Sequence, residues 1–302
     1  MKKQFQDRLA VVSFLLPNFL GFLAFTAGPV LFAVALAFCS WDLVSRPRFV
    51  GLANFWELLG FHATVEGWRP NDPHFWKYLY NTLFLMMMLP VNILGSLGLA
   101  LAINQKLRGT YFYRLVFFLP SILSGVAIFY LWRWMYNPHL GLINSVLGSI
   151  GIAGPNWLSD PRWAKPALML MGGWLSIGGT SMILYLAALQ NVPAELTEAA
   201  AIDGAGGWQR FRHVIWPSVA PVTFFILTMG LIYGFQSGFE TAYIMTGGGP
   251  FGTTTTLGYY VYNKAYVEFE MGYSAAVACV MFALVFMVTL VNWKLNGRKL
   301  AL

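Results

Sequence analysis

The stretch EAAAIDGAGGWQRFRHVIWP, residues 198–217, is a polar, alanine-rich segment between two long apolar runs. Ala199–Ala201 consists of the residue type that favours helix most strongly. Gly204–Gly207 then interrupts the helix, because glycine is a poor helix former, and Trp208–Ile215 reads as a second short helix. The stretch therefore predicts a helix–break–helix hairpin over 190–218.

Long apolar runs surround this hairpin, and none of them contains Asp, Glu, Lys or Arg. The chain has 302 residues, of which 58% are hydrophobic and 10% are charged, whereas a soluble domain carries about 25% charged residues. About 20 apolar residues in a helix cross a bilayer, and the alternating segments of a barrel are absent. We expect an all-α membrane protein, a single permease domain over 1–302. Its six transmembrane helices have core spans at roughly 10–39, 79–103, 115–132, 167–189, 219–239 and 273–293.

The basic residues predict how these helices are oriented. With a cytoplasmic N-terminus, more than half of the Lys and Arg residues fall on the inner segments, which are short and adjoin helix ends. This is the distribution of the positive-inside rule. Both termini and the hairpin are therefore expected in the cytoplasm. The net charge of +7 is a topology signal and does not indicate nucleic-acid binding, because no basic cluster is interleaved with aromatic residues in a soluble segment.

The hairpin has the composition of a docking element. Short helices are marginally stable alone in water, and an alanine-rich face lets another backbone approach closely. Such a helix suits a groove on a partner protein. The alternative is an interfacial helix that lies on lipid. Few large apolar residues are available for that, Leu196 and Ile202 being the main ones.

The hairpin resembles the EAA loop of bacterial ABC importer permeases. That loop has Glu-Ala-Ala, then Asp-Gly-Ala, a phenylalanine and a closing proline. Val214 stands where isoleucine is usual and Trp216 where leucine is usual. The residues at matching positions are Glu198, Ala199, Ala200, Asp203, Gly204, Ala205, Phe211 and Pro217. Further stretches are similar to carbohydrate permeases of the maltose and glycerol-phosphate importer type: FVGLANFWELL (49–59), RLVFFLPSILSG (114–125), WRWMYNPHLGLIN (132–144) and MTGGGPFGTTTTLGYYVY (245–262).

The resemblance implies a mechanical role in a multi-subunit importer. It implies the MetI-like fold of type I importer permeases and a place in the bacterial inner membrane. The expected partners are a second permease, two ATPase subunits, an extracytoplasmic solute-binding protein and membrane lipid, with no nucleic acid. The EAA residues would form a coupling helix that docks into the ATPase. Glu198 would meet a basic or polar group there, and Gly204 would permit the sharp turn.

The chain has no sequence features of an enzyme. A nucleotide-binding P-loop needs lysine followed by Ser or Thr, and no lysine here is followed by either. The histidines are scattered and show no metal-ligand spacing. We expect a non-catalytic subunit without a cofactor or metal of its own, with the ATP and Mg²⁺ used by the partner ATPase.

Polar side chains within the apolar runs suggest a substrate path, because such residues are costly in a membrane and often line pathways. Sugars are held by aromatic faces and a few placed hydrogen-bonding groups, and the resembling family binds sugar on the fourth and fifth spans when a permease has a site. An alternative is that these residues only bond and pack between helices. The candidates are Trp174, Ser176, Thr180, Tyr233, Gln236 and Ser237.

The sequence thus predicts the permease subunit of an ATP-driven ABC importer for a sugar, a related polyol or glycerol phosphate. The alternative is an ion-coupled secondary transporter. Transporters of that class tend to have inverted repeats and acidic residues within the membrane. The apolar runs here hold no acid, and the hairpin would have no role.

Overall fold

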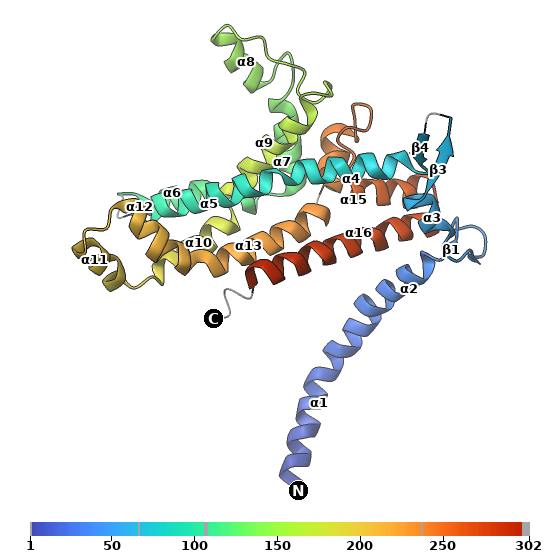
Figure 1. Cartoon of the computed structure of the whole chain (residues 1–302), viewed down its shortest axis with the longest axis horizontal. Coiled ribbons are helices and arrows are strands. Elements are labelled where there is room, and N and C mark those ends of the chain that lie inside the picture. The colour runs from blue at the N-terminus through green and yellow to red at the C-terminus, as the bar shows by residue number, and fades with distance from the viewer. Residues whose placement is uncertain (1, 66, 106–107, 237, 298–302) are drawn as a thin grey trace. The chain divides into compact units, whose positions relative to one another are not determined.

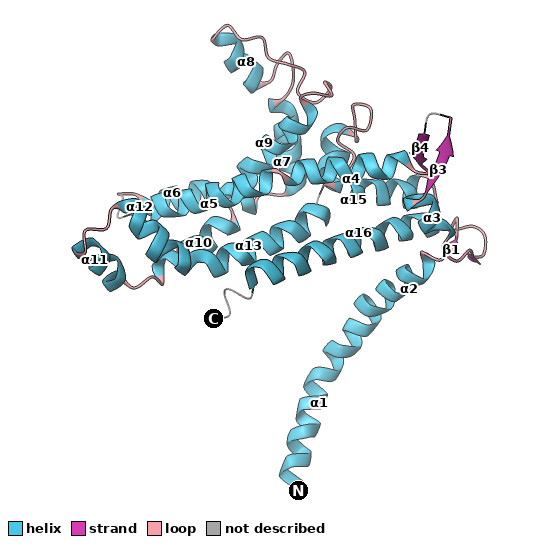
Figure 2. Ribbon diagram, viewed as in Figure 1, coloured by secondary structure: helices cyan, strands magenta, loops and turns pink. Residues whose placement is uncertain are grey.

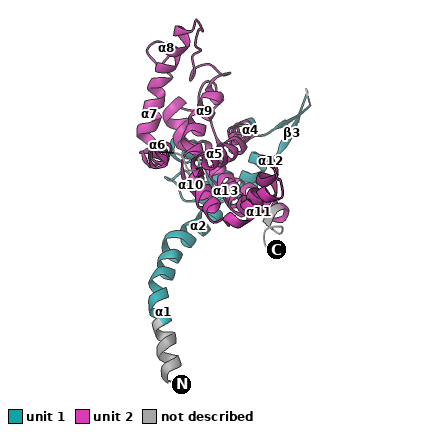
Figure 3. Ribbon diagram, turned by 90° about the vertical axis from the view of Figure 1, so that its left-hand side faces the viewer, with its two compact units in different colours: residues 1–73, 261–280 teal, residues 74–260, 281–302 magenta. Residues whose placement is uncertain are grey.

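The computed structural model describes residues 2–65, 67–105, 108–236 and 238–297, and most of them are helical (Figure 2). The chain divides into two compact units (Figure 3). Unit 1 comprises residues 1–73 and 261–280, and unit 2 comprises residues 74–260 and 281–302. A single permease domain over 1–302 stays a prediction.

Unit 1 begins with a long apolar helical segment in three parts (Figure 1). These parts are α1 (Lys2–Phe22), a π-helical turn (Leu23–Ala27) and α2 (Gly28–Leu36). The π turn ends just before Pro29, which has no N–H to continue the regular helical hydrogen bonding. None of the most apolar window between Val11 and Leu36 is buried. Its side chains therefore need lipid or another protein to cover them.

The loop that follows contains short strands that the sequence analysis did not predict. They form two antiparallel pairs, in which Cys39 faces Phe49 and Phe61 faces Pro70. The buried amide of Asn54 donates hydrogen bonds of 2.9 Å to the carbonyls of Ala37 and Cys39, and so holds the loop against the end of α2. The elements are β1 (Cys39–Ser40), β2 (Arg48–Phe49), α3 (Ala53–Leu59), β3 (Phe61–Thr64) and β4 (Gly67–Pro70).

Polar contacts anchor the other part of unit 1, which leads into the last long helix. The Lys264 ammonium lies 2.7 Å from Glu268 and 2.8 Å from Glu270. The Tyr273 hydroxyl donates a 2.6 Å hydrogen bond to Asp72. This segment holds the end of α15 (Leu257–Tyr262), a π turn (Asn263–Val267) and the start of α16 (Met271–Asn292).

Unit 2 contains most of the remaining helices. The break between its first two falls at Met87, three residues before Pro90, which cannot donate to the preceding turn. The helices are α4 (Pro73–Met86), α5 (Met88–Asn104), α6 (Thr110–Ile122), α7 (Gly125–Met135), α8 (Leu142–Ser149), α9 (Ala164–Ile177), α10 (Thr180–Gln190), α11 (Ala194–Ile202), α12 (Gly207–Arg210), a π turn (Phe211–Ile215), α13 (Trp216–Gln236), α14 (Phe239–Thr241) and a π turn (Ala242–Thr246).

Two apolar clusters form the core of unit 2. The inner cluster joins α5, α10 and α13, and the outer cluster joins α7 and α9. Their residues recur at intervals of three and four along each helix, which places them on one face. The inner cluster is Ile93, Leu97, Ala100, Ile103, Met182, Tyr185, Leu186, Leu189, Val219 and Ile226. The outer cluster is Ile128, Phe129, Trp132, Tyr136, Ala167, Leu168, Met171 and Met245.

The expected third span over 115–132 is not one continuous helix. It is the pair α6 and α7, bent by 99°. Leu123 and Ser124 between them are extended, with ψ of 151° and 128°. Pro120 lies just upstream and cannot donate a backbone hydrogen bond. The expectation of a single helix over this run is therefore wrong.

The other runs agree with the expected spans. Within the described residues, five helices are long and apolar enough to cross a membrane, and a sixth span results if α6 and α7 count as one. The lengths and apolar composition of these helices fit a mostly helical membrane protein in which one span is broken. The five helices are Val11–Leu36, Pro73–Asn104, Ala164–Gln190, Gly207–Gln236 and Met271–Leu295.

Candidate functional site

The predicted hairpin is present, and its turn depends on Gly204. Helix α11 ends there with hydrogen bonds from the Gly204 and Ala205 N–H groups to the Ala201 and Ala200 carbonyls, at 3.1 and 2.9 Å. Gly204 has φ +81°, which glycine adopts without the penalty that a Cβ brings. The Gly206 N–H donates to the Gln209 side chain at 2.8 Å and starts the second arm.

The hairpin surface is open to a partner. No residue of α11 is buried. Glu198, Ala199 and Asp203 are exposed, while Ala200 and Ala205 are half-buried. Large apolar side chains accompany them: Leu196, Ile202 and Trp208 are 53%, 87% and 69% exposed. The surface thus combines carboxylates with apolar side chains that only another molecule could cover.

The second arm does not end where the sequence predicted. Gly207–Gln236 is one continuous helical segment, so Trp208–Ile215 is not a separate short helix. Pro217 is exposed near the start of α13 and does not end the arm. The π turn at Phe211–Ile215 precedes it and shifts the hydrogen-bond register where the proline cannot donate.

Phe211 joins the hairpin to the core of unit 2. Its ring stacks on Trp208 at 5.5 Å and lies 6.3 Å from the Trp216 ring. Phe211 and Ile215 also pack against the inner cluster of α5, α10 and α13. The base of the hairpin therefore packs directly against the core of unit 2.

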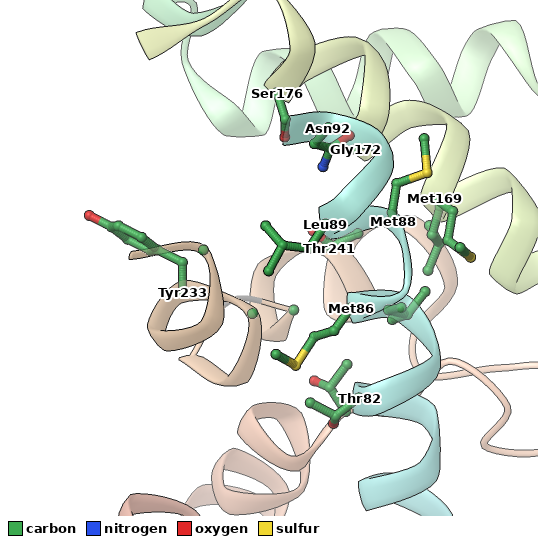
Figure 4. A pocket seen from close by; sticks show the side chains of 16 residues that line it. Thr82, Met86, Met88, Leu89, Asn92, Met169, Gly172, Ser176, Tyr233 and Thr241 are labelled. Atoms are coloured by element: carbon green, nitrogen blue, oxygen red, sulfur yellow. The ribbon is translucent and has the colours of Figure 1, made fainter. Parts of the chain in front are cut away.

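Two cavities lie among these helices. One of about 260 Å³ is formed by residues of α4, α5, α9 and α13 and of the segment 238–256, and is shown in Figure 4. The other, of about 510 Å³, is formed by residues of α5, α9, α10 and α13. Asn92, Ser176 and Tyr233 line both. In Figure 4 the Asn92 and Ser176 side chains lie near each other, while the Tyr233 ring extends to one side.

The structure brings some of the predicted path residues together and not others. Ser176 and Tyr233 line both cavities, and Thr180 lines the larger one. The Trp174 ring instead lies edge-on to Trp132, with centroids 5.6 Å apart, and lines neither cavity. Gln236 is exposed at the end of α13 and lines neither. Ser237 lies outside the described residues.

The family model described as "Binding-protein-dependent transport system inner membrane component" matches residues 77–298. The chain belongs to this family. The chain is also 35% identical over 297 residues to the "Probable ABC transporter permease protein YesP" of Bacillus subtilis (strain 168), covering 97% of this chain and 92% of that protein. It is 35% identical over 255 residues to the "sn-glycerol-3-phosphate transport system permease protein UgpA" of Yersinia enterocolitica, covering 83% and 81%.

A solved structure shares the fold of this inner membrane component. It is a bacterial alginate ABC transporter in complex with an alginate pentasaccharide-bound periplasmic protein. The TM-score is 0.85 at 22% sequence identity, with 99% of this chain and 98% of that chain covered. The MetI-like permease fold that the sequence predicted is confirmed.

Asn92 of this permease is a cavity residue that the sequence did not predict. Its Oδ1 atom is buried and has no hydrogen-bond partner among the described residues. An unpaired buried acceptor is costly, so a substrate hydroxyl that donates to it would remove a penalty. The signal was an amide within the apolar run 79–103. A polar side chain in a span can equally bond to a neighbouring helix, and the sequence does not distinguish the two.

Thr82 and Thr241 also line the smaller cavity and were not predicted. The Thr82 hydroxyl is occupied, since it donates to the Tyr78 carbonyl at 2.8 Å and accepts from the Leu257 N–H at 3.0 Å. It therefore shapes the cavity of this permease rather than offering a free hydrogen bond. Within the described ranges, no group of three or more His, Cys, Asp or Glu could hold a metal ion.

Proposed function

We propose that the chain is the permease subunit of an ATP-driven ABC importer that moves a sugar, a related polyol or glycerol phosphate into the cytoplasm. The substrate class is supported by the relatives, which include a glycerol-phosphate permease by name, and by the alginate transporter that shares the fold. In this proposal both termini and the hairpin are cytoplasmic, as the distribution of Lys and Arg favours.

One observation supports the proposed coupling role. The helix that leads into the hairpin and the helix that follows it both line the larger cavity. Helix α10 contributes Thr180 and leads into α11 through residues 191–193, and α13 contributes Tyr233. Between Phe211 and Tyr233 the chain is helical throughout, a length of about 33 Å. A rigid helix transmits a push at the hairpin to the cavity.

The proposed transport requires three kinds of partner subunit. The exposed Glu198 and Asp203 carboxylates, together with the nearby Ala199, Ala200 and Ala205, would face a basic or polar cleft of an ATPase subunit. Two ATPases would use ATP with Mg²⁺, and this chain would bind neither. A second permease would complete the pore, and an extracytoplasmic solute-binding protein would deliver the substrate.

The cavities would serve as part of the substrate path. Ser176, Thr180, Tyr233 and Asn92 would offer hydrogen bonds or an aromatic face to a sugar ring. Trp174, Gln236 and Ser237 remain candidates for contact with the substrate only in another conformation of the permease, or for the interface with the second permease.

Purification of the tagged full chain from its native membrane tests the proposal. We expect the wild type to retain an ATPase subunit and Glu198→Arg to lose at least 10-fold of it, since the charge reversal repels a basic cleft. Glu57→Arg is the matched control, because Glu57 is an exposed acid on α3, outside the hairpin. Retention of the ATPase by both variants would refute the coupling role. Uptake that needs an ion gradient and no ATP would favour the secondary transporter.

A further inference from the structure

Unit 2 has a groove between α6 and α10 that the proposed function does not use. Its volume is about 410 Å³. On each helix the lining residues recur at intervals of three and four, so that one face of each helix forms a wall. The α6 wall is Tyr111, Arg114, Leu115 and Phe118, and the α10 wall is Ile183, Leu186, Ala187 and Gln190.

The groove is polar at one end and apolar along the rest. Helix α6 begins, and α10 ends, on the side from which the hairpin leaves. Tyr111, Arg114 and Gln190 all lie on the helix turns at that end, whereas the deeper lining residues are Leu, Phe, Ile and Ala. This gradient suits an amphipathic molecule with its head beside the hairpin and its tail in the bilayer.

Arg114 indicates the charge of the head group. Its Nε atom is buried and has no hydrogen-bond partner among the described residues. Within the described residues no ion pair involves Arg114. A guanidinium binds the oxygens of a phosphate through paired hydrogen bonds, and leaving such a group unpaired is costly.

We propose that this groove binds an anionic phospholipid, with its phosphate on Arg114 and an acyl chain along Leu115, Phe118 and Ala187. A soluble partner cannot reach the apolar part, because it lies on helices of the membrane core. Basic residues at a membrane surface attract anionic lipids. Gln190 is the last residue of α10 before the hairpin, so the bound lipid would touch its base.

Native mass spectrometry of the full chain, purified in detergent and mixed with equal amounts of phosphatidylglycerol and phosphatidylethanolamine, tests this. We expect the wild type to retain phosphatidylglycerol at least 5-fold over phosphatidylethanolamine. Arg114→Gln should reduce the preference to about unity. Arg108→Gln is the matched control, because Arg108 is exposed two residues before α6 begins but does not line the groove. It should keep the preference.

A second variant tests the apolar wall. Ala187 is exposed on α10 and lines the groove, so Ala187→Trp fills the groove without replacing a core residue and should lower retention of both lipids by 3-fold or more. Equal retention of the two lipids by the wild type, or an undiminished preference in Arg114→Gln, would overturn the proposal. Cross-linking of Ala187→Cys to a second permease chain in native membranes would also overturn it, since the groove would then be an interface.

Discussion

At the scale of single residues, the turn of the hairpin depends on the backbone conformation of one glycine. Gly204 and Gly207 both have open space where a Cβ would stand, but only Gly204 has a positive φ, of +81°. Two glycines only three residues apart in the hairpin thus have different roles. One permits the turn, and the other begins a helix that any small residue could begin.

We expect Gly204→Ala to destabilise the hairpin by about 1 kcal/mol, because an L-residue in the left-handed region is strained. ATPase retention should fall several-fold in co-purification, with membrane insertion unchanged. Gly207→Ala in the same hairpin should retain the ATPase as the wild type does. Equal behaviour of the two variants would show that the turn conformation is not required for assembly.

The surroundings of Lys264 change the pKa of its ammonium group. Burial acts to lower the pKa of Lys264, but the hydrogen bonds to Glu268 and Glu270 outweigh it and raise the pKa above the usual 10.5. The folded state therefore holds the proton more tightly than the unfolded state. The stabilisation is fully present below pH 10.5 and is lost as the pH rises through the folded-state pKa.

Lys264→Met should accordingly lower the stability of the segment around the start of α16, by about 1 kcal/mol or less, because both carboxylates are half-exposed. Thermal melting of the wild type and the variant at a series of pH values measures this. The difference in Tm should stay constant from neutral pH to about pH 10 and narrow above it. A difference that narrows already between pH 7 and about pH 9 would contradict the assignment.

At the scale of elements, close backbone contacts decide where helices cross. Helices α9 and α10 are separated by Gly178 and Gly179, at the point where α6 crosses them. A Cβ at Gly178 would stand 2.2 Å from the Phe117 carbonyl oxygen, and one at Gly179 would stand 3.2 Å from the Ser121 side chain. Small residues at such crossings let membrane helices approach closely.

Gly178→Ala should destabilise the protein by about 1–3 kcal/mol, because the α6 backbone must move to admit the methyl group. Gly172→Ala on α9 is the control, since nothing lies within 4 Å of a Cβ there, and it should leave the Tm unchanged or raise it, because alanine favours helix more than glycine does. Thermal unfolding in detergent compares them. An unchanged Tm for Gly178→Ala would mean that the crossing is looser than the structure describes.

At the scale of the whole molecule, the proposed transport requires a cavity that is polar at chosen points within an apolar protein. Asn92 is such a point, because its Oδ1 atom is buried without a partner and the residue lines both cavities. A buried amide that only stabilises the fold would have its hydrogen bonds made by neighbouring residues. An unsatisfied acceptor costs about 1–3 kcal/mol of stability, which fits a residue kept for a ligand.

Asn92→Leu should therefore leave the Tm unchanged or raise it, while lowering ATP-dependent uptake by about 10-fold, the equivalent of ~1.4 kcal/mol. Proteoliposomes holding the complete importer measure uptake, and thermal melting measures stability. Asn18→Leu replaces an amide of another apolar run that lines neither cavity and should not change uptake. A fall in Tm without a change in uptake would make Asn92 a structural residue.

The sequence alone predicted the apolar spans of a membrane protein and the hairpin between two of them, because these features depend on local chemistry. Length, hydropathy and glycine placement act within a few residues of one another, so 198–217 and the spans could be read along the chain. The 99° bend between α6 and α7, the continuous segment Gly207–Gln236 and the gathering of Asn92, Ser176 and Tyr233 at two cavities were not readable in that way. Each depends on which helix faces pack together. That packing is decided by the total free energy of contacts between residues far apart in the sequence.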